Sequence, residues 1–167
     1  MKPTYELAVA FRVLDNPEAP GGKGAIPVYR GSKRNGTRTF TGRVNVVDKN
    51  HKAVTLWRAS VVEACRPGGK PLVSPGLNEP LVVRYFFALR RPASVRRPYP
   101  SVKPDVDNLV KGTADAITDS GLWRDDALVI SQVISKAYAG GHHPDGTAAL
   151  TVPGCVVEIY RIMIPVT

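Results

Sequence analysis

Cysteine is scarce in this 167-residue sequence, and long apolar runs are missing. The two cysteines, Cys65 and Cys155, lie far apart and form no CxxC pair. This excludes paired-cysteine zinc motifs and the disulfide frameworks of small secreted domains, so we expect two buried thiols in a reducing compartment. No window of about 18 apolar residues could span a bilayer. The first residues, MKPTY, also lack the apolar run of a signal peptide, so we expect a cytoplasmic protein.

Acidic residues are missing from two long stretches of a strongly basic chain. The sequence has 23 lysines and arginines against 14 aspartates and glutamates, a formal net charge of +9, and residues 19–47 and 90–104 contain no acid. This excess favours a polyanionic partner, because each cation placed against a phosphate releases condensed counterions. The alternatives are a solvated face for 19–47 and a disordered proline-rich linker for 90–104. The side chains that we expect to bind phosphates are Lys33, Arg34, Arg38, Arg90, Arg91, Arg96, Arg97 and Lys103.

Four carboxylates, by contrast, crowd into one short segment. Asp105 and Asp107 stand in KPDVDNLVK (103–111), and Asp125 and Asp126 follow in GLWRDDALV (121–129). Their mutual repulsion would raise some of the carboxyl pKa values unless a cation lay between them. Hard divalent ions such as Mg²⁺ bind one or two carboxylates and fill their other positions with water and phosphate oxygens. The segment therefore predicts a metal site suited to cutting a phosphodiester.

Periodicity and composition predict a single domain covering 1–167, with strands and helices in the order β-α-β-α-β-β. The glycine-rich stretch 19–47 is expected to be a flexible arm or a long hairpin. Residues 90–104 form a second flexible basic loop, and prolines and glycines make 67–80 a surface connection. The expected strands are 5–13, 81–89, 127–139 and 155–164, and the expected helices are 48–66 and 105–120.

Both predicted helices have signals at their ends. Asp48 or Asn50 can cap the first helix. The second can be entered through Pro104 or capped by Asp107, and Gly121 is suited to end it. Capping alone would explain the acids at the start of this helix, but it would not explain the acidic pair after its end.

Two tryptophans and two histidines are assigned to structure rather than to function. Trp57 lies on the apolar stripe of the first helix, which favours packing over stacking on a base. Trp123 is expected to anchor the turn that holds the second acidic pair. His142 and His143 are adjacent in a glycine-rich turn, where we expect exposed side chains rather than metal ligands.

The chemistry of the acids suggests how they act together. Asp105 and Asp107, two apart in an extended lead-in, would point to one side, and Asp126 would return after the helix to complete a cage. A cation held there would polarise a phosphate and lower the pKa of a bound water. Lys111, one turn beyond Asp107, would stabilise charge on the phosphoryl oxygens or orient the attacking water.

The ordered set of motifs resembles the RusA family of Holliday-junction resolvases. It consists of D-x-D-N-x-x-K, a helix containing Asp115 and Ala116, and G-x-W-x-D-D-x-x-V. A lone DxD would be weak evidence, but the whole set in this order is specific. The rest of the chain matches only in the order of its elements, and the basic stretches look longer than a minimal member needs.

The resemblance implies a small α+β domain, a mixed sheet with two helices packed on it. It also implies a homodimer in which each subunit nicks one of two opposed strands of a four-way DNA junction during recombination and repair. It also implies Mg²⁺ as cofactor, with Mn²⁺ as a substitute, a nucleoid-associated protein of phage or prophage type, and no membrane or small-molecule cofactor. The family's essential acids, catalytic and metal-binding, fall on Asp105, Asp107 and Asp126, and its essential lysine falls on Lys111. The role of Asp125 stays open, and the basic side chains named above would bind the DNA.

Two other functions fit the same residues. One is a nuclease that cuts other branched DNA, such as replication forks. The other is a non-catalytic DNA-binding module whose acids only cap a helix.

Overall fold

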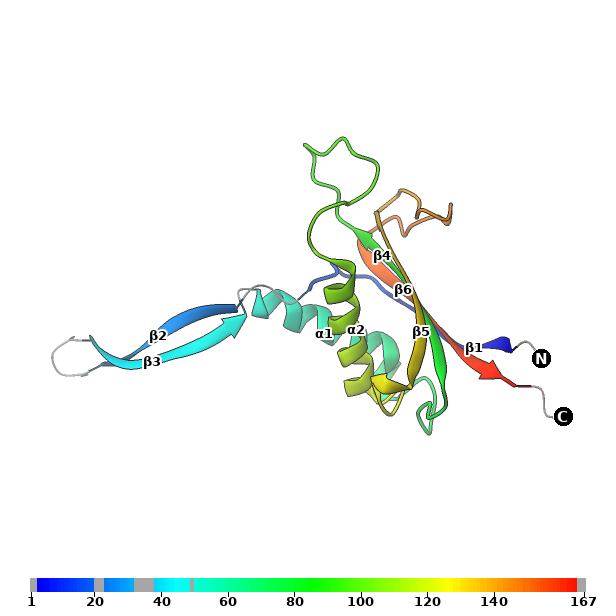
Figure 1. Ribbon diagram of the computed structural model, residues 1–167, viewed down its shortest axis with the longest axis horizontal. Helices are drawn as coiled ribbons and strands as arrows, with labels where there is room; N and C mark the ends of the chain where they lie inside the picture. Colours follow the sequence, from blue (N-terminus) through cyan, green and yellow to red (C-terminus); the bar gives the residue numbers. More distant parts are fainter. Residues whose placement is uncertain (1–2, 20–22, 32–37, 49, 165–167) are drawn as a thin grey trace.

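The body of the protein is a four-stranded sheet in the order β1-β6-β4-β5 (Figure 1). The computed structural model describes residues 3–19, 23–31, 38–48 and 50–164. Strand β6 pairs antiparallel with β1 and with β4, whereas β4 pairs parallel with β5. The sheet is therefore mixed, as predicted. The strands are β1 (Thr4–Val13), β4 (Leu81–Leu89), β5 (Val129–Tyr138) and β6 (Gly154–Met163).

Two helices, α1 (His51–Cys65) and α2 (Val106–Ser120), pack on one face of this sheet, which confirms the predicted α+β arrangement (Figure 1). The apolar stripes of both helices are buried in one core together with the inward-facing side chains of β4. Asn50 is the N-cap of α1, but its side chain makes no capping hydrogen bond and its amide donates to the carbonyl of Ala19 (2.6 Å). No helix in the described ranges is long and apolar enough to cross a membrane.

The tryptophans and cysteines are buried, as predicted. Trp57 donates to the hydroxyl of Thr113 (3.2 Å) and Trp123 to that of Thr118 (2.7 Å), so both indole N–H groups bond to α2. Both cysteines are free thiols, and burial raises the pKa of Cys65 to about 11. Two tryptophans thus fix α2 against α1 and against the turn that follows it.

The basic stretch near 19–47 forms an antiparallel hairpin of β2 (Lys23–Gly31) and β3 (Arg38–Asp48). Figure 1 shows this hairpin projecting away from the body beyond the start of α1. The long-hairpin alternative is confirmed, and the order β-α-β-α-β-β is wrong because it omits these two strands. Many glycines and cations hide the alternation by which strands are recognised, whereas the hydrogen bonds between the paired strands satisfy the backbone.

The segment 67–80 is more than a surface connection, and this prediction is wrong for Leu77. Leu77 is 1% exposed and forms a parallel bridge with Trp123. Its backbone N–H donates to the carbonyl of Leu122 (2.8 Å), and its carbonyl accepts from Arg124 (3.0 Å). The connection therefore holds the turn after α2 in place.

A pair of leucine substitutions tests this role. We expect Leu77→Ala to lower the free energy of unfolding by about 2–5 kcal/mol, because a buried leucine loses its packing and leaves a cavity. Leu72→Ala, in the same segment but 43% exposed, should change it by less than about 0.5 kcal/mol. Urea denaturation measures both variants. Equal stabilities would show that the segment does not support the turn.

Candidate active site

The first two acids of the motif stand at the start of α2. Asp105 is the N-cap residue in extended backbone (φ −74°, ψ 146°) without a side-chain capping bond, and Asp107 lies in the first turn. The predicted extended lead-in holding both acids, and the predicted cap at Asp107, are wrong because the helix begins at Val106. Both carboxylates are exposed. The positive end of the helix dipole stabilises negative charge at this place.

One face of α2 continues the site. Lys111 follows Asp107 by four residues and Asp115 follows Lys111 by four, so their side chains stack along the same side of the helix. All three line a groove of about 630 Å³ between α2 and β5, which Asp126 also lines. We call it the acidic groove. Its remaining lining residues are Tyr85, Val106, Val110, Ala114, Val129, Ile130, Ser131, Gln132 and Ile134.

The turn after α2 places Asp126 in this groove. Gly121 ends the helix in the left-handed conformation (φ 75°), as predicted. The carboxylate of Asp125 accepts from the N–H of Ala127 (2.8 Å) and so caps the short 3₁₀ turn Asp126–Leu128. Asp125 therefore has a local structural partner, and its neighbour Asp126 is the member of the pair that faces the groove.

The floor of the acidic groove contains a buried tyrosine. Burial raises the pKa of Tyr85, and the negative charge of Asp126 adds to the same effect. The phenol therefore stays protonated at neutral pH and adds no negative charge between the carboxylates. It lies in the middle of β4, opposite Ile134 of β5.

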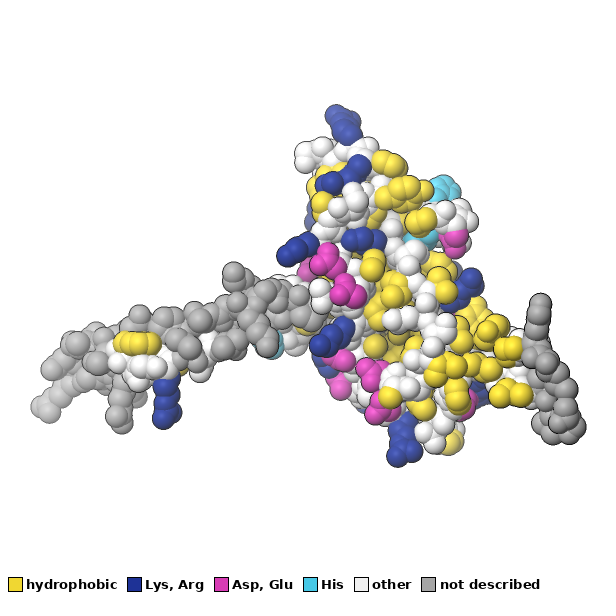
Figure 2. Space-filling view, viewed as in Figure 1, with side chains coloured by type: hydrophobic (Ala, Val, Ile, Leu, Met, Phe, Trp, Pro, Cys, Tyr) yellow, Lys and Arg dark blue, Asp and Glu magenta, His cyan; other side chains and the backbone are white. Residues whose placement is uncertain are grey.

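The carboxylates form two groups along α2 rather than one cage. Asp105 and Asp107 lie at its first turn, whereas Asp126 follows its last. Helical rise alone separates Asp107 from Ser120 by about 20 Å. Within the described part of the chain, no three His, Cys, Asp or Glu side chains lie close enough to hold a metal ion. Figure 2 shows acidic side chains gathered over α2 in more than one group, with lysine and arginine side chains beside them.

The available donors nevertheless suit a hard divalent ion. The carboxylates of Asp105, Asp107 and Asp126 are all exposed, and their oxygens can bind a metal ion. Mg²⁺ in proteins uses one or two carboxylates together with water and phosphate oxygens. The neighbouring pair Asp105 and Asp107 satisfies that requirement within one chain. A site of this kind would be open to a DNA strand.

Lys136 is a member of the site that the motif did not reveal. It lies on β5, and its ammonium donates to the carbonyls of Val102 (2.7 Å) and Pro104 (2.8 Å). Burial lowers its pKa, and the nearby charge of Asp105 opposes that shift. Lys136 therefore fixes the chain just before α2. No sequence pattern indicated this contact, because Lys136 lies far along the chain from Val102 and Pro104. Only the pairing of β5 with β4 brings it to the start of α2.

Arg58 is a second residue that sequence reasoning missed. From α1 it pairs with Asp115 (3.4 Å) and with Asp119 (2.5 Å), both on α2. These side chains are partly exposed, so each pair adds little stability. The pairing does orient the carboxylate of Asp115, which also lines the acidic groove.

Some of the predicted DNA-binding side chains lie outside the described part of the structure, and the others lie in the loop 90–104. Lys33 and Arg34 lie outside the described residues, and only the backbone of Arg38 is described, at the start of β3. Arg91 donates to three carbonyls of its own loop and lies 5.2 Å over the ring of Tyr138, so it supports the loop. Arg91 is nevertheless exposed, as are the other cations of that loop, Arg90, Arg96, Arg97 and Lys103.

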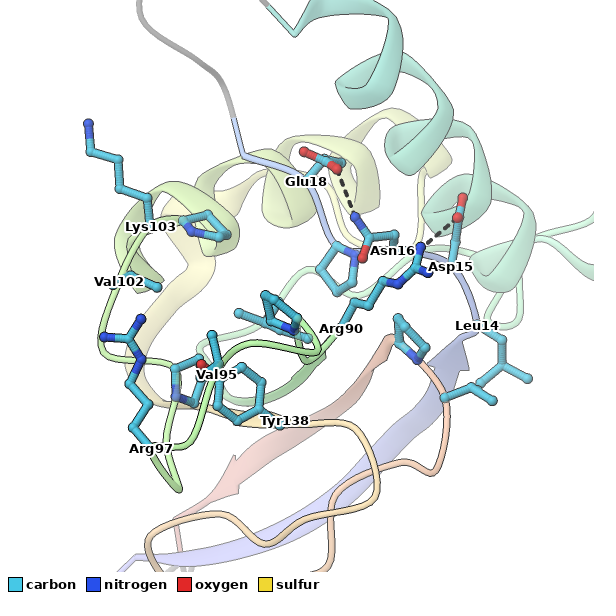
Figure 3. Close-up of a pocket in the computed structure, with 17 residues that line it drawn as sticks. Leu14, Asp15, Asn16, Glu18, Arg90, Val95, Arg97, Val102, Lys103 and Tyr138 are labelled. Atoms are coloured by element: carbon cyan, nitrogen blue, oxygen red, sulfur yellow. Dashed lines mark hydrogen bonds between the residues drawn. The ribbon is translucent and has the colours of Figure 1, made fainter.

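A second, larger pocket lies beside these cations. It measures about 1030 Å³ and is lined by residues 14–18, by the loop 89–104 and by Tyr138, Val152 and Pro153. Figure 3 shows Arg97 and Lys103 on one side of it, with Asp15 and Glu18 on the other. The loop 90–104 thus forms one wall of this pocket.

The histidine pair is only partly as predicted. His142 is exposed, but His143 is buried, and its Nδ1 lies 2.8 Å from the hydroxyl of Ser135. Burial lowers the pKa of His143. Its ring also contacts Phe86 edge to face, so it belongs to the packing under the turn.

Comparison with known proteins gives one finding that bears on this site. The family model described as endodeoxyribonuclease RusA matches residues 30–144, more than half of the chain. The match includes all four motif aspartates, Lys111 and the loop 90–104. No curated protein matches the chain.

The role of Lys136 can be tested by amide hydrogen exchange. Lys136→Met removes two charge-assisted hydrogen bonds to the chain before α2, so the amides of residues 101–106 should exchange roughly ten-fold faster. Lys103→Met removes an exposed lysine from the same segment and serves as the matched control. Exchange unchanged in Lys136→Met would show that this lysine does not hold the segment.

Proposed function

Because the chain belongs to the RusA family of endodeoxyribonucleases, we propose that it is a Mg²⁺-dependent enzyme that resolves four-way DNA junctions by paired, symmetric nicks. The family itself implies junction-resolving endonuclease activity. The observation that supports the finer proposal is the placement of Asp107, Lys111 and Asp126 around one open groove. A non-catalytic module would not need a lysine and a second acid there.

Asp105, Asp107 and Asp126 are the proposed metal-binding and catalytic acids. When bound, Mg²⁺, or Mn²⁺ in its place, supplies a Lewis acid for the scissile phosphate and lowers the pKa of a bound water. The exposed carboxylates of Asp105 and Asp107 flank the positive end of α2. Lys136 keeps the chain that leads to them in place.

Lys111 is the proposed partner of the phosphate. Its ammonium lies one turn from Asp107 on the same helix face, so an oxygen of a phosphate in the groove would lie within its reach. A fixed cation stabilises the charge that develops on the phosphoryl oxygens in the transition state. Tyr85, kept protonated by burial, leaves the floor of the groove uncharged.

The basic surface brings DNA to these acids. The exposed cations of residues 90–104 stand directly before Asp105, and they offset the repulsion between the carboxylates and a phosphate backbone. The net charge of +9 acts in the same direction over a longer range. We assign residues 1–167 to a single catalytic domain that works as a homodimer, because two symmetric nicks require two sites related by a two-fold axis.

Substitution of single acids tests the catalytic assignment. We expect Asp107→Asn and Asp126→Asn each to lower the rate of nicking of a synthetic four-way junction by roughly 100-fold or more, because each removes the negative charge of a proposed metal-binding carboxylate. Binding of the junction, measured without a divalent ion, should remain.

Asp125→Asn is the matched control, because an asparagine oxygen can still accept from the N–H of Ala127. It should cut at close to the wild-type rate. If Asp107→Asn and Asp126→Asn cut as well as the wild type, these acids are not catalytic.

A fork and a linear duplex, tested in parallel with the four-way junction, distinguish junction resolution from action on other branched DNA. Omission of the divalent ion should abolish cutting.

The salt dependence of binding tests the basic loop. Arg97→Ala should lower the slope of log K against log salt concentration by about 1, since one phosphate contact is lost. Arg12→Ala removes an exposed arginine from β1 instead and should leave the slope unchanged. Fluorescence anisotropy of a labelled junction between low and moderate salt measures both. An unchanged slope for Arg97→Ala would exclude a phosphate contact by this side chain.

A further inference from the structure

The larger pocket, beside the loop 90–104, contains a buried hydroxyl. Tyr138 lines this pocket and is 4% exposed. Within the described part of the chain, its hydroxyl has no hydrogen-bond partner. Buried polar groups are nearly always paired, because an unpaired one costs free energy. The pocket therefore presents a hydrogen-bonding group that a ligand can use.

The walls around this hydroxyl are largely apolar. They include Leu89, Pro92, Pro100, Pro104, Val152 and Pro153. Ligand sites combine walls of this kind with a few polar groups that fix orientation, in volumes of roughly 300–1,000 Å³. This pocket measures about 1030 Å³, so a flat heterocycle of the size of a nucleobase fits between its walls.

Opposite charges mark the two sides of the pocket. Figure 3 shows Arg97 and Lys103 on one side, and Asp15 and Glu18 on the other. Among the described residues, no ion pair joins these two sides. The cations attract a phosphate and the carboxylates repel it, whereas the amino group of a base can donate to a carboxylate. A nucleotide thus fits with its backbone on the cationic side and its base toward the acids.

Hydrogen bonds hold the two carboxylates in place. Asp15 accepts from the backbone N–H of Asn16 (2.7 Å) and from the hydroxyl of Ser60 (2.7 Å). Glu18 accepts from the side-chain amide of Asn16 (2.8 Å). Acceptors that are already fixed lose little freedom when a ligand binds, so this side of the pocket is preorganised.

The pocket adjoins the acids at the start of α2. Lys103 and Pro104 line it, and Asp105 is the next residue along the chain. Lys136 donates to the carbonyl of Pro104 (2.8 Å) and so fixes this wall. A DNA strand with a phosphate at Asp105 therefore brings a neighbouring nucleotide to the mouth of the pocket.

We propose that this pocket receives one unstacked base of the DNA strand that is cut, and that the hydroxyl of Tyr138 bonds to the edge of that base. Enzymes that take a base out of its stack hold it between apolar side chains and bind its edge by hydrogen bonds. Opening costs least where pairing is already interrupted, as at the branch point of a junction. The inference rests on the proposed function for the nearby cut, and it adds a preference for the base at one position beside the nick.

Fluorescence of 2-aminopurine tests whether a base enters the pocket. Four-way junctions that carry this analogue at single positions around the branch point are bound without a divalent ion. At one position the fluorescence should rise several-fold, because the base leaves its stack. Val152→Trp fills the pocket from a residue that is 47% exposed and should abolish the rise, whereas Leu72→Trp, outside the pocket, should not.

Two outcomes of this measurement would overturn the pocket. One is the absence of a rise at every position. The other is a rise that persists in Val152→Trp. Millimolar nucleoside monophosphates should leave the signal unchanged. If they abolish it, the occupant is a free nucleotide, and the assignment to the DNA strand is wrong.

Tyr138→Phe tests the hydroxyl, because it keeps the ring that Arg91 contacts and removes only the oxygen. Among junctions that differ in the base at the position found above, the ratio of fastest to slowest nicking should fall from at least five-fold to below two-fold. Tyr99→Phe, an exposed tyrosine of the same loop, should keep the wild-type ratio. An unchanged ratio in Tyr138→Phe would show that the hydroxyl does not select the base.

Thermal denaturation supplies a readout that does not depend on cutting. The midpoint of Tyr138→Phe should not fall, because the hydroxyl has no partner among the described residues. A lower midpoint would reveal a structural role and overturn the assignment. A wild-type protein that cuts no junction overturns the proposed function instead, and the fluorescence without a divalent ion still decides the pocket.

Discussion

The parallel pairing of β4 with β5 is the constraint on which the rest of this structure depends. Parallel neighbours need a long crossover, and here that crossover contains the basic loop, α2 and the turn after it. The helix therefore runs back along the strands. Its start lies near the end of β5, and its end lies near the beginning of that strand. Every acid of the motif takes its position from this path.

Two contacts fix the ends of the crossover. At the start, Lys136 bonds to carbonyls of the chain that leads into α2. At the end, Leu77 and Trp123 pair in the core, and Asp125 caps the turn that presents Asp126. Rigid support of this kind is what a catalytic group needs, because small displacements from productive geometry are costly in rate. The exposed acids themselves contribute little to stability.

Much of the fold was accessible from sequence patterns. The strand 81–89, the helix stop at Gly121 and the buried roles of Trp57 and Trp123 follow from local composition and spacing, and the structure confirms them. The errors have physical reasons. Glycines and cations concealed the hairpin strands, and Leu77 is buried by a bridge to a residue far along the chain, which no local pattern encodes.

The sequence by itself determined the chemistry of this protein: the ordered carboxylates, Lys111 and the acid-free basic stretches, which together point to DNA cutting and to the family that the comparison shows. Such signals are local, because residue type and spacing along one helix suffice to read them. Only the tertiary structure decided where the acids lie. Helix rise and the parallel crossover separate Asp107 from Asp126, strand pairing brings Lys136 to Asp105, and β5 is the last strand of the sheet among those described. These are relations between segments distant in sequence, which packing and hydrogen bonding set only in the folded chain.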